Sequence, residues 1–205
     1  MNVFSIIKIM PKAKEQFEEM RQEAVRKIKT AGLELFARKG LSGTNIKEIA
    51  EKANISLGLM YHYYSSKEEL YLALANEAMD MSIALLSSLK KNKMGAKEKV
   101  EGFVEGFLTG VQKYPEICYF IIIGQQFETK EASENETLNN HKMESMKLLG
   151  SIIKAGQIQG VFIKGDPLQL AAMLIAATQG LAAFRMTFGT DFKMPGKELL
   201  MNMLT

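Results

Sequence analysis

Hydroxyl, imidazole and ammonium groups suited to phosphate oxygens gather in one short stretch of this chain. They belong to Thr44, Tyr61, His62 and Lys67. Between them lies a run of small and apolar side chains that suits base edges, since a leucine there can contact a thymine methyl group. This run comprises Ser56, Leu57, Gly58 and Leu59. Lys47 suits either role, and the pattern predicts a surface that binds double-stranded DNA.

These residues need two short helices to position them, and residues 45–64 have the pattern of a helix-turn-helix. Apolar residues stand where the two helices must pack, at Ile49, Ala53, Ile55, Met60 and Tyr63. Ala50 is small where the helices cross, and Asn54 stands at the turn, which often requires a positive φ. The motif would place its second helix in the DNA major groove.

Capping residues support the same boundaries. Thr44 carries an acceptor oxygen suited to the N-cap of the first helix of the motif, and Ser56 is placed to cap the second. Ser66 is followed three residues later by Glu69, the spacing of a capping box that opens a third helix. A helix pair with no role in nucleic-acid binding is the competing interpretation.

Residues 21–74 resemble the DNA-binding domain of the TetR family of transcriptional regulators. The matching residues are Ala31–Gly40, Gly43-Thr44, Ile49-Ala50, Ile55-Ser56, Gly58, Tyr61–Tyr64 and Ser66–Leu70. The departures are Asn45 for the usual second threonine, Asn54 for glycine, Leu59 for the common threonine and Tyr64 for phenylalanine. Because Leu59 removes a hydroxyl from the base-reading surface, the operator of a relative does not carry over.

Composition and charge fit a DNA-binding domain followed by a larger helical domain. Residues 1–71 carry 12 Lys and Arg against 9 Asp and Glu, and the remainder carries 14 of each, so the whole net charge of +3 lies in the first part. We therefore expect an all-α protein with a DNA-binding domain at 14–74 and an effector-binding and dimerisation domain at 75–205. The single cysteine, Cys118, excludes an internal disulfide and favours a cytoplasmic location.

Apolar periodicity predicts the remaining helices. We expect them at 14–39, from 66 to a loop near 90–95, from 96 to a break at Pro115, at 117–127 as a central helix, from about 138, from 167 to about 188, and at 195–204. On the helix from 66, one face carries Leu70, Leu74, Met81, Leu85 and Leu89. Residues 128–140 are polar and predict a surface loop. Met10 as well as Met1 could start translation, with the first residues as a frayed extension.

The second domain offers a candidate pocket and a candidate interface. Flexible Met and flat Phe side chains suit an adaptable apolar pocket, for which we nominate Phe103, Phe107, Phe120, Met143 and Met146. Glycines recur at 102, 106 and 110, either to let two helices approach closely or to leave room for a ligand. The helix after Pro167 resembles the dimer-forming part of the TetR family, which assigns Ala172, Ile175, Ala176, Gln179 and Ala183 to a homodimer interface.

The resemblance implies a homodimer on a pseudo-palindromic operator, most often a repressor that a small apolar effector releases. We expect no membrane partner, since the most apolar run, 168–184, contains Gln169 and Gln179. We expect no enzymatic activity, cofactor or metal, because the only histidines are His62 and His141 and neither belongs to a ligand cluster. A helical protein–protein adaptor and a DNA-binding protein without ligand control remain the alternatives.

Overall fold

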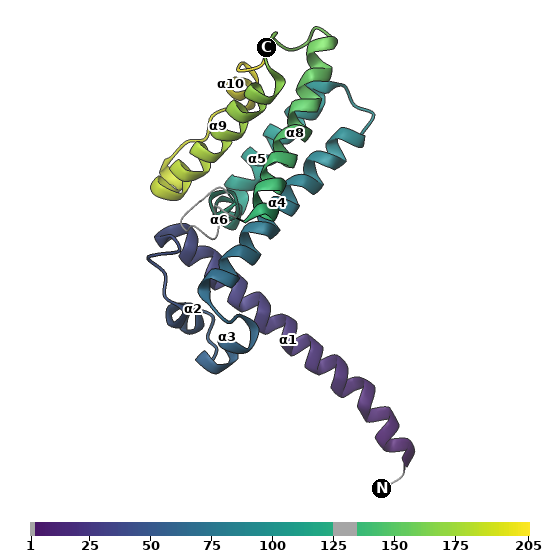
Figure 1. The fold of residues 1–205 in the computed structure, drawn as a ribbon, viewed down its shortest axis with the longest axis vertical. Helices are drawn as coiled ribbons and strands as arrows, with labels where there is room; N and C mark the ends of the chain where they lie inside the picture. Colours follow the sequence, from purple (N-terminus) through teal and green to yellow (C-terminus); the bar gives the residue numbers. More distant parts are fainter. Residues whose placement is uncertain (1–2, 125–134) are drawn as a thin grey trace. The chain divides into compact units, whose positions relative to one another are not determined.

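The computed structural model describes the backbone of residues 3–124 and 135–205, and all the regular secondary structure within these ranges is helical (Figure 1). The all-α fold class is therefore confirmed. The chain divides into two compact units, one ending at Tyr71 and the other beginning at Leu72.

The first unit consists of α1 (Val3–Lys39), α2 (Ile46–Lys52), α3 (Leu57–Tyr63) and the start of α4 (Lys67–Lys91). Its fully buried side chains come from all four helices and from the loop after α1, and include Ile28, Phe36, Leu41, Ile49, Met60, Leu70 and Tyr71. The rings of Phe36 and Tyr71 meet edge to face with centroids 5.4 Å apart, a geometry that adds about 1 kcal/mol beyond the burial itself. This core holds the two short helices that could not stand alone in water.

The helix-turn-helix lies where the sequence predicts it, and its turn has the predicted backbone. Asn54 has φ 53°, the only positive φ among the described non-glycine residues. The Ile55 amide then donates to the carbonyl of Ala50 at 3.0 Å, which closes the turn after α2. Asparagine tolerates this conformation better than other side chains with a Cβ, so it replaces the usual glycine.

Two helix starts in the first unit differ from the predictions, and a third agrees with its prediction. Helix α1 begins at Val3 rather than at about residue 14, and Pro11 lies inside it. The N-cap of α2 is Asn45, whose Oδ1 accepts from the Lys47 amide at 2.9 Å, and not Thr44. Ser56 caps α3 as predicted, accepting from the Leu59 amide at 3.1 Å.

The capping box at the start of α4 is only half formed. The Ser66 hydroxyl accepts from the Glu69 amide at 3.1 Å, as predicted. The Glu69 carboxylate, however, accepts from the amide and hydroxyl of Ser65 at 2.7 and 2.6 Å, one residue earlier than a capping box requires. Both hydrogen bonds lower the pKa of Glu69, and the one from the Ser65 hydroxyl has the larger effect.

The second unit contains the rest of α4, α5 (Ala96–Lys113), α6 (Pro115–Ile123), α8 (Glu136–Ile158), α9 (Pro167–Phe188), the short 3₁₀ helix η1 (Gly189–Asp191) and α10 (Lys197–Met201). Helix α8 packs along α9, while α5 packs against α6, α8 and α10 (Figure 1). The core includes Leu86, Val100, Val104, Val111, Leu149, Ile153, Ala171 and Leu174.

Helix starts in this unit follow proline and capping signals. Asp166 caps α9 by accepting from the Leu168 and Gln169 amides, and Pro167 occupies the first turn, as predicted. Helix α6 starts at Pro115 rather than 117 for the same reason. Helix α8 starts at Glu136 because Asn135 accepts from the Leu138 amide, so residues 136–140 are helical and not loop. Residues 125–134, which include the predicted end of the central helix and most of the predicted loop, lie outside the described residues.

Two expectations about burial are wrong. On α4, Met81 and Leu85 are 53% and 47% exposed, while Leu86 lies in the core, because the buried face turns to one side of the predicted stripe. On α6, Cys118 and Ile123 are buried, but its other described apolar side chains are only half-buried. A cavity in the second unit explains these departures, since both helices line it. Burial raises the pKa of the Cys118 thiol.

Two described helical stretches, Lys67–Lys91 and Pro167–Asp191, are long and apolar enough to cross a membrane by length and composition. In this structure the first contributes Leu70, Tyr71, Leu74 and Leu86 to protein cores, and the second contributes Ala171, Leu174 and Ala182. Core helices of soluble proteins pass the same test of length and composition.

Asn54→Ala should lower the free energy of unfolding by about 1 kcal/mol, because alanine is strained at positive φ. Asn54→Gly should leave it within about 0.5 kcal/mol, because glycine adopts this conformation freely. Urea unfolding followed by circular dichroism measures both. An equal loss in the two variants would show that the asparagine side chain, and not the backbone conformation, stabilises the turn.

Candidate nucleic-acid interface and effector cavity

Helix α3 presents the predicted base-reading residues to solvent. Leu57, Gly58 and Leu59 are exposed, and so are Tyr61 and His62 further along the helix, while the capping residue Ser56 is exposed at its start. The side chains of Leu57 and Leu59 are 40% and 37% exposed. Met60, on the opposite face, is fully buried and anchors the helix. The first turn of α3 is therefore free to enter a groove, as a recognition helix requires.

Gly58 lies in open space on this surface. A Cβ added there would meet no heavy atom within 4 Å, and its φ requires no glycine. Nothing inside the protein therefore explains the missing side chain. A glycine at this place allows the backbone of α3 to come close to an external partner.

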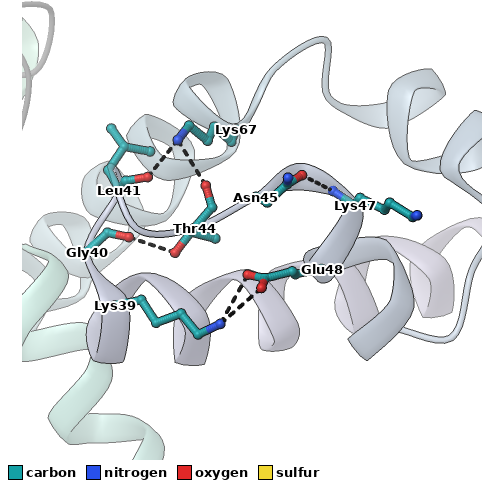
Figure 2. Close-up of polar contacts among 8 residues, drawn as sticks. All are labelled: Lys39, Gly40, Leu41, Thr44, Asn45, Lys47, Glu48 and Lys67. Carbon is teal, nitrogen blue, oxygen red and sulfur yellow. Dashed lines mark hydrogen bonds and ion pairs between the residues drawn. The ribbon is translucent and has the colours of Figure 1, made fainter.

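Lys67 ties the start of α4 to the loop that precedes α2 (Figure 2). Its ammonium group donates to the carbonyl oxygens of Leu41 at 2.8 Å and Thr44 at 2.9 Å. The sequence predicts a phosphate contact at this residue, and the structure gives two of its three donors to the protein itself. Lys67 thus has a positioning role within the protein.

Thr44 faces inward and does not offer its side chain to a phosphate. Its hydroxyl donates to the Gly40 carbonyl, and the residue is only 2% exposed (Figure 2). Its predicted roles as N-cap and as phosphate contact are therefore corrected to one role, in which it holds the loop after α1. A threonine at this place is equally compatible with a capping and a buried hydroxyl, so the sequence does not separate them.

Two ion pairs fasten α2 to α1. Lys39 lies 3.1 and 3.2 Å from the Glu48 carboxylate oxygens (Figure 2). Lys52 lies 3.0 Å from Glu34. The hydrogen bond from Lys39 lowers the pKa of Glu48. Because these pairs are largely exposed, each contributes a modest stabilisation. The two pairs also neutralise the carboxylates of Glu48 and Glu34, which would otherwise repel a phosphate backbone.

A polar hollow of about 500 Å³ lies beside α3 in the first unit. Its lining includes the predicted residues Thr44, Tyr61 and Lys67, and also Ser42, Asn45, Ser65, Ser66 and Glu68, which the sequence pattern does not assign to DNA binding. Serines in loops are common, so no pattern in the sequence distinguishes these. Lys47 is exposed on α2, with its ammonium 3.9 Å from Glu51.

The second unit holds a larger cavity of about 820 Å³ between α4, α5, α6, α8 and α9. All five residues nominated for a pocket line it: Phe103, Phe107, Phe120, Met143 and Met146. Its volume falls in the range of small-molecule sites, and most of its lining is apolar. The structure thus brings together side chains from helices far apart in the sequence.

The three periodic glycines of α5 have different surroundings. Gly110 allows a close approach by Ile117, whose Cδ1 would lie 2.8 Å from an added Cβ, and Gly102 has only an ordinary contact with Leu89. Gly106 lines the cavity, and an added Cβ would meet nothing within 4 Å. Both interpretations of the glycine pattern therefore apply, each to a different residue.

The residues nominated for a dimer interface divide between two faces of α9. Ala172, Ile175, Ala176 and Gln179 line the cavity. Ala172, Ala176 and Ala183 are exposed, and Ile175 and Gln179 are half-buried. An exposed stripe of residues spaced by three or four runs along the helix, and we call it the α9 stripe: Met173, Ala176, Gly180, Ala183 and Thr187.

Lys67→Met should lower the melting temperature of the protein, because two carbonyl oxygens of the loop lose their charged donor. A hydrogen bond to a charged group contributes about 1.5–3 kcal/mol to stability, and the loop also loses the contact that fixes its geometry. Lys47→Met is the matched control, since it removes the same charge from an exposed position. Thermal unfolding by circular dichroism distinguishes them. Equal melting temperatures for the two variants would rule out the positioning role of Lys67.

Comparison with known proteins agrees with this geometry. Residues 28–74 match the family model described as "Bacterial regulatory proteins, tetR family". The chain is 26% identical over 161 residues to the HTH-type transcriptional regulator RutR of Escherichia coli K12, covering 77% of this chain and 73% of that protein.

Solved structures share the fold. A putative fatty acid metabolism regulator of Clostridium perfringens superposes with TM-score 0.69 at 20% identity, over 87% of this chain and 96% of that one. FadR of Bacillus subtilis in complex with stearoyl-CoA gives TM-score 0.66 at 19% identity, over 87% and 95%. With the exposed recognition helix, the tetR-family match over residues 28–74 identifies the chain as a DNA-binding transcriptional regulator with a TetR-type DNA-binding domain.

Proposed function

We propose that this protein is a ligand-controlled repressor that binds a pseudo-palindromic operator as a homodimer and leaves it when a small apolar effector binds. The observation that carries the proposal is the continuity of α4. This one helix begins with Lys67 beside the DNA-binding loop and continues into the wall of the 820 Å³ cavity, where Met81, Leu85 and Leu86 lie. A ligand that displaces the cavity wall can therefore bias the DNA-binding unit.

The DNA contacts divide into two classes. Ser56, Leu57, Gly58 and Leu59 face the bases, with Leu57 or Leu59 against a thymine methyl group. Tyr61, His62, Lys47 and the remaining donor of Lys67 hold phosphates, which fixes the register of α3 in the groove. No acidic residue occurs in α3, so nothing on this helix repels the DNA backbone.

The homodimer forms through α9. The α9 stripe places Met173 and the small residues Ala176, Gly180 and Ala183 at solvent-exposed positions, where they allow a second helix to pack closely. Phe184 and Phe188 extend the apolar surface, with 52% and 57% exposed. Dimerisation supplies the twofold symmetry that a pseudo-palindromic operator needs.

The effector occupies the cavity of the second unit. Support comes from its apolar lining and from FadR of Bacillus subtilis, a protein of the same fold whose solved structure is a complex with stearoyl-CoA. Regulators of this family are soluble bacterial proteins, and a protein that acts on chromosomal DNA belongs in the cytoplasm.

The first experiment is fluorescence anisotropy with labelled DNA from the region flanking the gene, with unrelated DNA as competitor and at several salt concentrations. Competitor-resistant binding that small apolar compounds reverse supports the proposal, and a promoter–reporter fusion then distinguishes repression from activation. Binding that no ligand changes would favour the regulator without ligand control, and no specific binding to any operator would favour the adaptor.

Gly58→Leu should weaken operator binding at least tenfold in the same assay, because the new side chain projects from the surface that approaches the bases. It should also leave the fold intact or raise its stability by up to about 1 kcal/mol, since leucine favours a helix more than glycine does. Unchanged affinity for the operator would remove α3 from the interface with the bases.

Ala183→Arg should convert the dimer to a monomer and lower operator affinity at least tenfold, because a charge is introduced into the α9 stripe. Ala84→Arg makes the same change at an exposed position of α4 and should alter neither property. Light scattering after size exclusion measures the mass of each variant. A dimeric Ala183→Arg variant would place the interface elsewhere.

A further inference from the structure

The polar lining of the effector cavity is sparse and one-sided in charge. Among the described residues that line it, Lys142 is the only charged one, and none is an aspartate or a glutamate. The other polar lining side chains are Ser82, Asn139, Ser145, Thr178 and Gln179. This described lining does not treat acids and amines alike, because the charge that it carries is positive.

The hydroxyl groups of the lining are engaged within the protein. Those of Ser82 and Ser145 bond to each other at 2.8 Å, and the Thr178 hydroxyl donates to the Ile175 carbonyl at 2.7 Å. The bond between the two serines links α4 to α8, and the Thr178 bond lies within α9. These hydroxyl groups therefore have a structural role. Asn139 and Lys142 stand one helical turn apart on α8, on the same face.

Helix α8 therefore offers the cavity a polar end followed by an apolar stretch. Asn139 and Lys142 come first, and Met146 follows one turn after Lys142. Phe107 and Ile175, from α5 and α9, add to the apolar part of the lining. An elongated molecule with one polar end matches this arrangement better than a uniformly apolar one.

The ammonium nitrogen of Lys142 is shielded from solvent. Removing a charged group from water is costly, and this desolvation lowers the pKa of Lys142 to about 8. Lysine still carries its charge at neutral pH with such a pKa. An anion beside it would form a charge-assisted hydrogen bond in surroundings where such bonds are strong.

We propose that the effector is an amphipathic acid, with an apolar body among the phenylalanines and methionines of the cavity and one negatively charged group bound by Lys142. This inference rests on the proposed effector role of the cavity and specifies the class of ligand. A neutral analogue offers Lys142 no opposite charge, and an amine meets a like charge.

Isothermal titration calorimetry of the full-length protein tests this at pH 7.5 with four probes of one chain length, each below its micelle concentration. Decanoate should bind about tenfold or more tightly than 1-decanol, and decylamine should bind more weakly than either. Monodecyl phosphate shows whether the anionic group can be a phosphate as well as a carboxylate. Either anion binding in preference to 1-decanol supports the proposal.

Lys142→Met should lower the affinity for decanoate to that for 1-decanol while leaving 1-decanol binding unchanged. Lys147→Met is the matched control on the same helix, because Lys147 is exposed and does not line the cavity, and it should keep the full preference. Lys142→Arg should restore the preference for the acid. Thermal unfolding confirms that each variant is folded.

The outcomes separate this inference from the proposal beneath it. If wild-type protein binds neither decanoate nor monodecyl phosphate more tightly than 1-decanol, or if Lys142→Met keeps the preference for the anion, the assignment of an acid is overturned while the cavity remains an apolar site. If none of the probes binds, or if Gly106→Leu, which fills the cavity, weakens none of them, the effector role of the cavity fails and this inference fails with it.

Discussion

The ammonium group of Lys67 is the contact on which the DNA-binding unit depends. It bonds to two carbonyl oxygens of the loop between α1 and α2, so the start of α4 and the start of α2 have one fixed separation. Helix α3 lies between these points in the sequence and has one fully buried anchor, Met60. A helix of seven residues with one buried anchor is stable only when the segments before and after it are held in place. The Lys67 contact holds the segment after α3 against the loop before α2.

Helix α9 has three faces, each with different surroundings. One side packs in the core through Leu174 and Ala182, another lines the cavity through Ile175 and Gln179, and the third carries the α9 stripe. Ala176 belongs both to the cavity lining and to the stripe. A ligand that moves this part of α9 would therefore change the proposed dimer surface directly, with no relay through other elements.

The charge of the protein is distributed in keeping with these roles. The excess positive charge lies in residues 1–71, where Lys39 pairs with Glu48 and Lys52 with Glu34. Helix α3 itself carries no acidic residue. In the second unit, Lys142 is the one charged residue among the described residues of the cavity wall, and its ammonium nitrogen is shielded from solvent. In the proposed site this charge distinguishes acids from neutral molecules and amines, which the apolar lining does not.

The sequence by itself determined the all-α fold, the helix-turn-helix and the turn at Asn54, because these depend on local periodicity and on backbone conformations that few residues adopt. Local patterns also located the caps at Ser56 and Asp166. Only the tertiary structure decided that Thr44 turns inward and that Asn45 takes its place as N-cap, since both residues can cap a helix and the choice depends on the Gly40 carbonyl nearby.

The faces of α4 and α9 were likewise decided by packing. Met81 and Leu85 are as apolar as Leu86, so their periodicity cannot show that they border a cavity rather than a core. Helix α9 is apolar on every side, and composition alone assigns none of its faces. Sequence determines which side chains avoid water, whereas the arrangement of neighbouring helices determines whether protein, a ligand or a second chain covers them.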